Sequence, residues 1–275
     1  MIRKTSRPDC CAHPKPSAIL PSVCWIGRNE WGGLPALTAS GANVFLIRGR
    51  ESDVLVDTGH GNILPQLERN IRYVGGEAGR VAEIWMTHSH WDHSGLAAQW
   101  QRKHPHVRVR MSAIGARFIR RGDLRLVGCP IDRRARFSAP VRIEPLHEGD
   151  ILQCPPHEFT VVGLGGHTPD CVGYRGVVDG IDMMFSGDAI IGEQGNVHGN
   201  IGWLDGLWQS DVHDYRKTLQ KVIADCPKLI IPGHGVPNFG SVARRGVRNC
   251  LRRLEKLLAI KDLSGMMPVF GNFKD

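Results

Sequence analysis

Residues Thr87 to His93 read Thr-His-Ser-His-Trp-Asp-His, which places three imidazoles and one carboxylate within a single short segment. Groups packed this tightly repel protons and one another unless a cation lies among them. Imidazole nitrogen and carboxylate oxygen are the ligands that borderline metals such as zinc accept at short range. The segment therefore predicts a metal site in preference to a His-rich surface loop.

Further candidate ligands each lie just beyond a short apolar run. They are Asp57 after Val54–Val56, His167 after Phe159–Leu164, Asp188 after Met183–Phe185 and His234 after Leu229–Ile231. Each stands in a turn that contains glycine, as residues beyond a buried strand often do. Loops at one end of a layered sheet could bring all of them to one place. A single such histidine is usually a core residue, but the whole set favours one shared site.

The elements expected to position these residues form an α/β pattern. Further buried strands are expected at Val44–Ile47, Ile84–Met86 and Val107–Met111, because these runs are apolar and rich in β-branched residues. Helices are expected over Ser94–Lys103, over Val212–Ala224 with Ser210 or Asp211 as a cap, and along the apolar stripe from Val247 to Leu258. The apolar stripes are expected to cover a sheet face. A subunit interface, and hence a homo-oligomer, is the other interpretation.

Length and composition are those of a globular protein. The 275 residues can bury one large core; residues 1–20 look like a flexible tail, and residues 21–275 are expected to form a single domain because they show no linker or repeat. No run approaches the roughly 20 apolar residues that a membrane helix needs. The first residues lack an apolar stretch, and none of the eight cysteines forms a Cys-x-x-Cys pair. These features predict a cytoplasmic protein that does not enter a membrane.

The net charge of +8 is concentrated in three arginine-rich segments, 102–121, 125–136 and 244–253. Such charge attracts anionic substrates or nucleic acid. Solvated helix and loop faces are the plainer interpretation, and nucleic acid is not the expected partner. A small-molecule substrate with an anionic or aromatic part is expected instead.

In order and context, the ligand-bearing segments resemble the motifs of the metallo-β-lactamase-fold hydrolases, and the resemblance runs from about Asn43 to Gly235. It implies a four-layer αββα sandwich with the site along one edge of its two sheets. It also implies two metal ions, with the ligands His88, His90 and His167 for the first, Asp92, His93 and His234 for the second, and Asp188 as a bridge. Asp57 resembles the carboxylate that orients a ligand loop or imidazole in such sites.

The chemistry that the resemblance implies is metal-dependent hydrolysis. Two divalent cations close together lower the pKa of a shared water and give a bridging hydroxide near neutral pH, which attacks a carbonyl or phosphoryl centre. Asp92 is expected to orient this nucleophile and can take its proton, so Asp92 and Asp57 are the catalytic candidates. Zinc is the expected metal, and the same ligands suit iron or manganese. Ser89 and Cys171 are interpreted as loop and packing residues.

Differences from the motifs of individual branches of the family reduce the number of substrate classes to be expected. A bridging Asp188 resembles the glyoxalase II-like hydrolases of esters, thioesters and lactones more than true β-lactamases. Ile191 stands where acyl-homoserine lactonases carry Tyr, and His90 stands where flavodiiron proteins carry Glu. The leading hypothesis is a binuclear hydrolase of a small carbonyl ester, thioester or lactone. The alternatives are a phosphodiesterase or nuclease, a β-lactam hydrolase, an iron-dependent persulfide dioxygenase and a non-catalytic binding module.

Substrate contacts are expected from two loops. The loop over residues 31–43 would contribute Trp31 and Leu34, and the loop over residues 196–208 would contribute His198, Trp203 and Trp208. Aromatic groups there suit an apolar or ring-bearing substrate, and the tryptophans could equally pack the loop itself.

Overall fold

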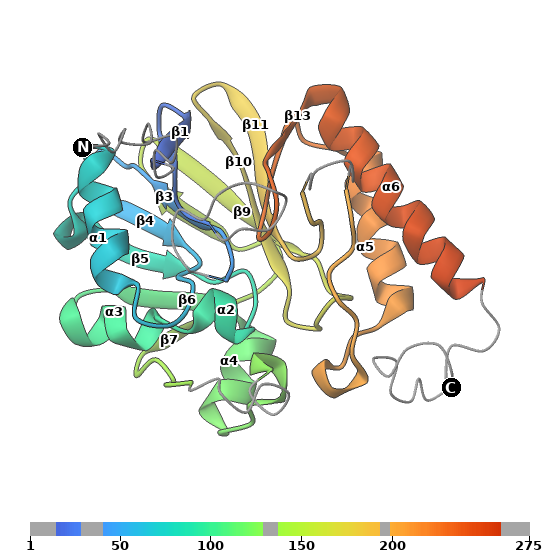
Figure 1. The fold of residues 1–275 in the computed structure, drawn as a ribbon, viewed down its shortest axis with the longest axis horizontal. Coiled ribbons are helices and arrows are strands. Elements are labelled where there is room, and N and C mark those ends of the chain that lie inside the picture. Colours follow the sequence, from blue (N-terminus) through green and yellow to red (C-terminus); the bar gives the residue numbers. More distant parts are fainter. Residues whose placement is uncertain (1–14, 29–40, 129–136, 193–198, 260–275) are drawn as a thin grey trace, which may run out of the picture.

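Two β-sheets packed face to face form the centre of the molecule. The computed structural model describes residues 15–28, 41–128, 137–192 and 199–259. Helices cover the outer face of each sheet, so the layers run helix, sheet, sheet, helix (Figure 1). The expected αββα sandwich is confirmed. Among the described residues, no helix is both long and apolar enough to cross a membrane.

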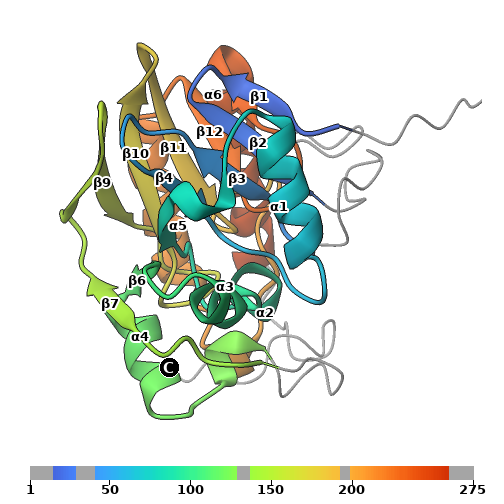
Figure 2. The ribbon, with the colours of Figure 1, turned by 90° about the vertical axis from the view of Figure 1, so that its left-hand side faces the viewer.

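The first sheet contains seven strands in the order of the sequence. They are β1 (Ser17–Leu20), β2 (Val23–Gly27), β3 (Val44–Ile47), β4 (Asp53–Val56), β5 (Val81–Trp85), β6 (Arg108–Ser112) and β7 (Ile143–Leu146). Strands β4 to β7 run parallel, and parallel strands need a crossover connection. The crossovers contain α1 (Leu64–Tyr73) and the 3₁₀ turn η1 (Ala78–Arg80), then α2 (Trp91–Ser94) and α3 (Ala97–Lys103), then α4 (Ala113–Arg120) and η2 (Arg125–Val127). Figure 2 shows this side of the molecule.

The second sheet has the strand order β13-β12-β11-β10-β9-β8. Its strands are β8 (Ile151–Cys154), β9 (His157–Gly163), β10 (Val172–Val178), β11 (Ile181–Gly187), β12 (Leu229–Pro232) and β13 (Asn238–Phe239). Strands β11 and β12 are parallel and joined through η3 (Gly206–Trp208) and α5 (Val212–Ala224), and α6 (Gly240–Leu258) follows β13. Helices α5 and α6 together cover the outer face of this sheet (Figure 1).

Three apolar cores hold the layers together. The central core lies between the sheets and includes the rings of Phe45, Trp85, Phe159, Tyr174 and Phe185. Strand side chains alternate between faces, so each sheet contributes its other face to an outer core. One outer core joins the first sheet to α1, α3 and α4, and the other joins the second sheet to α5 and α6. The sandwich therefore fixes the strand ends from which the candidate ligands extend.

The extents of several elements differ from the sequence-based predictions. Helix α6 begins at Gly240, before the predicted stripe from Val247 to Leu258. The tail predicted over residues 1–20 is too long, because Ser17–Leu20 forms β1 and pairs with β2, with Leu20 buried. The helix predicted over Ser94–Lys103 is two helices, α2 and α3. It breaks because the Leu96 amide donates to Gly59 O and Thr58 Oγ1 in the loop after β4, instead of continuing the first helix.

The remaining predicted strands coincide with or overlap observed ones, and the helix predicted over Val212–Ala224 has those bounds. Asp211 is its cap, because its carboxylate accepts hydrogen bonds from the amides of His213 and Asp214. Helices α1 and α4 and strands β1, β2, β7, β8, β10 and β13 were not predicted.

Candidate metal centre

The predicted ligands lie on loops that leave the same end of the two sheets. The segment with His88 and His90 follows β5, and the first turn of α2 carries Asp92 and His93. The other ligands follow β9 (His167), β11 (Asp188) and β12 (His234). Within the described residues, three sets of these side chains bring their donor atoms within 4.8 Å of one another. They are His88 with His90 and His167, His88 with His93 and Asp188, and Asp92 with His93 and His234.

The three-histidine group consists of His88, His90 and His167. His90 Nδ1 lies 3.1 Å from His167 Nε2, and the His88 ring lies 4.7 Å from the His90 ring and 5.2 Å from the His167 ring. Two nitrogens bound to one tetrahedral zinc at its usual bond length would be about 3.3 Å apart. The spacing of these nitrogens therefore fits a shared metal ion.

The Asp92 group consists of Asp92, His93 and His234. Asp92 Oδ2 lies 3.3 Å from His234 Nε2 and 3.9 Å from His93 Nε2. Asp188 lies between this group and the three-histidine group. Its Oδ2 is 3.4 Å from His234 Nε2 and 3.8 Å from His167 Nε2, and its Oδ1 is 3.4 Å from His93 Nε2.

Several of these donor atoms are buried and lack hydrogen bonds. Among the described residues, His88 Nε2, His93 Nε2 and Asp188 Oδ1 are inaccessible to solvent and have no hydrogen-bond partner. Buried polar atoms without partners are rare because each costs free energy. Here three of them come from one set of converging side chains. A cation is the partner that two imidazole nitrogens and a carboxylate oxygen have in common, so the residues are able to bind metal ions.

Asp57 fixes the orientation of two of these imidazoles. Its Oδ2 accepts from His93 Nδ1 at 2.8 Å and from Thr87 Oγ1 at 2.8 Å, and its Oδ1 accepts from the Thr87 amide at 2.8 Å. Thr87 Oγ1 in turn lies 3.1 Å from His88 Nδ1. In both rings Nδ1 is engaged by these contacts, so Nε2 is the nitrogen that faces the site and that carries the lone pair when the ring is neutral.

The third imidazole, that of His167, is oriented by a backbone carbonyl. Its Nδ1 donates to Trp203 O, so its Nε2 is the atom that faces His90. Ser210 Oγ donates to His167 O, and the Tyr215 hydroxyl accepts from the Gly202 amide and donates to the carbonyl of Ala189. These contacts could not be predicted from the sequence, because hydroxyl and carbonyl partners have no distinctive spacing.

Asn43 clamps the loop that carries His234. Its Nδ2 donates to Pro232 O at 3.0 Å and to Gly235 O at 2.9 Å, while its backbone amide donates to Gly233 O at 2.7 Å. Asn43 precedes β3 of the first sheet and the loop follows β12 of the second. This buried clamp therefore ties the two sheets together at the site.

The imidazoles of the three-histidine group favour the neutral form. Burial lowers the pKa of His88, His90 and His167. Neighbouring imidazoles lower the pKa of His88 and His90 further. Only a neutral imidazole can donate a lone pair to a metal, so burial prepares these side chains for ligation.

Charges are balanced differently around the Asp92 group. Burial opposes ionisation of Asp92 and Asp188, but the adjacent imidazoles of His93 and His234 outweigh it and hold both carboxyl pKa values well below their usual range. Burial also lowers the pKa of His93 and His234, but the carboxylates outweigh it and raise both. Both carboxylates are therefore ionised at neutral pH, as a cation site requires.

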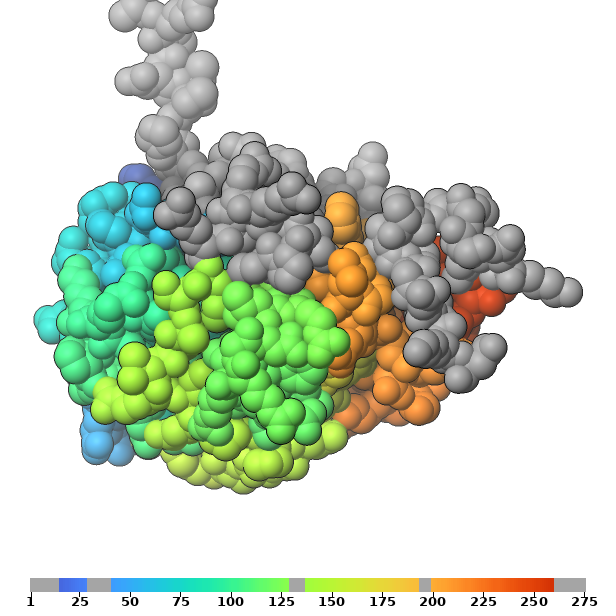
Figure 3. All heavy atoms as spheres, turned by 90° about the horizontal axis from the view of Figure 1, so that it is seen from below, coloured from blue at the N-terminus to red at the C-terminus, as the bar shows by residue number. Residues whose placement is uncertain are grey.

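A cavity of about 330 Å³ opens beside both groups. Its polar wall includes His90, Asp92, His167, Asp188 and His234, and its other wall is formed by Trp91, Gly128, Ile191, Asn200, Ile201, Trp203 and Trp208. The surface of α4 and η2 adjoins the segment that contains η3 (Figure 3). Two of the predicted substrate contacts, Trp203 and Trp208, thus line the cavity. The others, Trp31, Leu34 and His198, lie outside the described residues.

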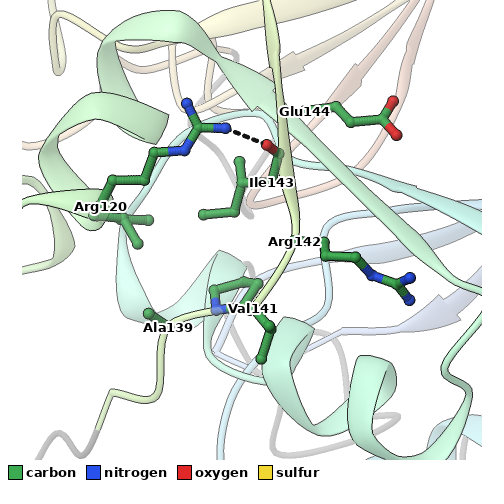
Figure 4. A pocket seen from close by; sticks show the side chains of 8 residues that line it. Arg120, Ala139, Val141, Arg142, Ile143 and Glu144 are labelled. Atoms are coloured by element: carbon green, nitrogen blue, oxygen red, sulfur yellow. Dashed lines mark hydrogen bonds between the residues drawn. The ribbon is translucent and has the colours of Figure 1, made fainter.

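A second hollow, of about 550 Å³, lies at the edge of the first sheet. It is formed by residues 139–144 and by Ile119 and Arg120 of α4, and Arg120 donates to the carbonyl of Ile143 (Figure 4). None of the predicted ligands lines it. The candidate site is therefore the smaller cavity.

Comparison with known proteins places the chain in a family. A model of the metallo-beta-lactamase superfamily matches residues 37–234, which include every predicted ligand. The chain belongs to this superfamily. The expectation that it is a hydrolase is confirmed at this level.

Curated relatives are 25–30% identical to the chain over the aligned residues. A Bos taurus protein named acyl-coenzyme A thioesterase MBLAC2 is 30% identical over 216 residues, which cover 70% of this chain and 72% of that protein. The Homo sapiens protein of the same name is 29% identical with the same coverage. A Drosophila melanogaster protein named beta-lactamase-like protein 2 homolog is 25% identical, and the match covers 73% of this chain and 60% of that protein.

Solved structures show the same fold at lower identity. A mutant metallo-beta-lactamase from Cronobacter sakazakii superposes with a TM-score of 0.70 at 18% identity, over 90% of this chain and 97% of that chain. BJP-1, a subclass B3 metallo-beta-lactamase of Bradyrhizobium japonicum, gives a TM-score of 0.67 at 18% identity, over 92% and 96%. These likenesses concern the fold alone.

Proposed function

We propose that this chain is a binuclear metal-dependent hydrolase of a small acyl thioester. The observation that carries the proposal is the position of Asp188. Its Oδ1 lies 3.4 Å from His93 Nε2, and its Oδ2 lies 3.4 Å from His234 Nε2 and 3.8 Å from His167 Nε2. A carboxylate that faces both donor groups supports two ions with Asp188 between them. The vertebrate relatives named acyl-coenzyme A thioesterase favour a thioester over the ester and lactone alternatives.

In this proposal the three-histidine group holds one ion and the Asp92 group holds the other. Divalent ions bound there would supply Lewis acidity to a carbonyl oxygen and would lower the pKa of water. Zinc is the proposed metal, because neutral imidazoles and carboxylates are its usual nitrogen and oxygen ligands. Iron or manganese would suit the same donors.

The chain's own residues would orient and deprotonate the attacking water. Asp92 is the most exposed of the site carboxylates, with 21% of its side chain accessible, and it lines the cavity. Because Oδ2 faces the imidazoles of His234 and His93, the other oxygen of the ionised carboxylate can accept a hydrogen bond from water and take its proton. A thiol nucleophile is disfavoured, because burial raises the pKa of Cys171 and its sulfur contacts Thr168 Oγ1.

The apolar wall of the cavity would receive the acyl part of the substrate. Trp91, Ile191, Ile201 and Trp208 line the cavity together with the donor groups. Burial of a short acyl chain against them is favourable by about 0.8 kcal/mol per methylene. This places Trp208 among the proposed substrate contacts.

The test is metal analysis of the purified protein together with a substrate panel. We expect two ions per chain, and hydrolysis of short acyl thioesters that a chelator abolishes and added metal restores. Retained turnover by a metal-free preparation would overturn the proposal. Exclusive turnover of a β-lactam or a phosphodiester, or oxygen uptake with a persulfide, would replace it with the corresponding alternative.

Two variants, one at Asp188 directly after β11 and one at Asp182 on β11, serve as a matched test and control. Asp188→Asn should weaken binding of the second metal ion and lower turnover by about 100-fold or more, because an amide cannot replace a carboxylate between two cations. Asp182→Asn, on β11, removes a surface contact with Arg175 and should leave both ions in place.

A further inference from the structure

A buried carboxylate outside the proposed ligand set joins two of the ligand loops. Asp170 is 1% exposed and lies in the loop after β9. Its Oδ2 accepts from Ser89 Oγ at 2.5 Å, and its Oδ1 accepts from Thr168 Oγ1 at 2.6 Å. Ser89 is the central residue of the His-Ser-His segment, and Thr168 directly follows His167. One side chain therefore contacts both loops that carry the three-histidine group.

The surroundings of Asp170 are unfavourable for a carboxylate. Among the described residues, no lysine, arginine or histidine forms an ion pair with it. Its carboxyl accepts from the hydroxyls of Ser89 and Thr168 and from the backbone amides of Ser89 and Asp170, yet burial outweighs these hydrogen bonds and raises its pKa. Burying an unpaired carboxylate opposes folding, and hydrogen bonds offset only part of that cost. A group that is costly for stability yet placed between ligand loops indicates a role in the site.

Helix α4 closes this contact off from solvent. A Cβ atom on Gly115 would lie 2.7 Å from Asp170 Oδ2 and 2.7 Å from Ser89 Oγ, so only glycine allows the helix to approach this closely. Solvent is thereby excluded from the pair, and hydrogen bonds in such a low-dielectric setting resist displacement more than exposed ones do.

We propose that Asp170 is a positioning residue that holds the two loops of the three-histidine group together. By holding Ser89 and Thr168, it sets the distance between His90 and His167, whose facing nitrogens lie 3.1 Å apart. The inference rests on the proposed function, since it presupposes that these histidines bind a metal ion. The Asp92 group is held by other contacts, those of Asp57 with His93 and of Asn43 with the loop around His234. Loss of Asp170 should therefore weaken one ion and spare the other.

The test measures metal affinity and needs no substrate. Metal-free wild type, Asp170→Asn and Asp170→Ala are titrated with Zn²⁺ against a chromophoric chelator, and with Co²⁺ by visible absorption. We expect the affinity for one ion to fall by about 10- to 100-fold in Asp170→Ala, the usual effect of losing an outer partner of a metal ligand. Asp170→Asn should lose less, because its amide can still bond both hydroxyls. His167→Gln and His234→Gln, each lacking a ligand of one group, identify which ion is affected.

Two further variants keep the test decisive if the Asp170 variants fold poorly. Ser89→Ala removes one hydroxyl, and Gly115→Ala pushes a methyl group against both oxygens; each should weaken the same ion. Asp53→Asn is the matched control, because Asp53 is also 1% exposed but lies on β4 beside Arg80. It should lower thermal stability and leave both metal affinities unchanged.

The outcomes separate the two proposals. If wild type binds no ion, the proposed function fails. If wild type binds two ions and the Asp170, Ser89 and Gly115 variants bind both equally well, or lose both to the same extent, the positioning role of Asp170 is overturned.

Discussion

Asp57 Oδ2 lies 2.8 Å from His93 Nδ1, and both side chains are buried. Asp57 has a φ of +57°, in the left-handed region that few residues other than glycine, asparagine and aspartate adopt. The backbone therefore turns sharply after β4, which aims the carboxylate at the imidazole from behind the site. The carboxylate fixes the ring orientation of His93 and leaves Nε2 facing Asp188.

Asp57→Asn should weaken metal binding with little effect on folding. An amide that donates to Thr87 or His93 can no longer accept every hydrogen bond that the carboxylate accepts, so the orientation of His93 is lost. We expect metal affinity to fall by about 10- to 100-fold, measured by chelator competition, with circular dichroism unchanged. Unaltered affinity would show that His93 is held by other contacts.

Gly233→Ala should damage the site through steric contact. A Cβ there would lie 2.4 Å from Asp188 Oδ1 and 2.6 Å from His93 Cε1, closer than atoms can approach. We expect turnover to fall by more than tenfold and the free energy of unfolding to fall by about 1–3 kcal/mol. Gly79→Ala is the matched control, because nothing lies within 4 Å of its added methyl group. A Gly233→Ala enzyme with wild-type turnover would mean that the loop can shift freely.

Trp208→Ala should impair substrate binding. Both tryptophans line the cavity, but the Trp208 ring lies 4.3 Å from the His90 ring, whereas Trp203 is 67% exposed. We expect KM for a short acyl thioester to rise by about 10-fold or more in Trp208→Ala, since burial of an apolar group contributes about 1–3 kcal/mol. Trp208→Phe should retain most of the affinity, and Trp203→Ala should change it little, because its backbone carbonyl still orients His167. Equal effects of Trp208→Ala and Trp203→Ala on KM would argue against this assignment.

Glu68→Gln should give a stability loss that depends on pH. Burial opposes ionisation of Glu68, but hydrogen bonds from Lys103 at 2.6 Å and His104 at 3.2 Å outweigh it, so its pKa lies below the usual value. A depressed pKa in the folded state stabilises the protein above the unfolded pKa of about 4.3, and the effect disappears as pH falls through the folded pKa. We expect Glu68→Gln to be about 1 kcal/mol less stable near pH 7.

The pH series for Glu68→Gln is recorded by thermal unfolding in wild type and variant. The difference in Tm should shrink as the pH falls below about 4. A difference that stays constant from pH 7 to pH 3 would mean that packing of α1 against α3, and not charge, stabilises this contact.

Local patterns were sufficient to predict much of the fold. Apolar runs such as Val44–Ile47 are buried in strands, and Val212–Ala224 is a helix, because burial period and capping residues are encoded within a few neighbouring positions. Strand β8 and helix α4 were not predicted, because their local patterns are weak. Ile151 is half exposed at a sheet edge, and α4 is a short helix that contains Gly115, which weakens the helical pattern.

The sequence alone determined which residue types could bind metal and that each stands after a strand, since ligand chemistry and strand ends are local properties. Only the tertiary structure decided how the ligands are held. Ser89 and Asp170 are 81 residues apart, and Asn43 and Gly235 are 192 apart. Such contacts depend on how two sheets pack and which loops they bring together, and no spacing along the chain encodes that arrangement. The sequence of Thr87–His93 is therefore enough to predict metal-binding residue types. The geometry that would allow a two-ion site is a property of the folded sandwich.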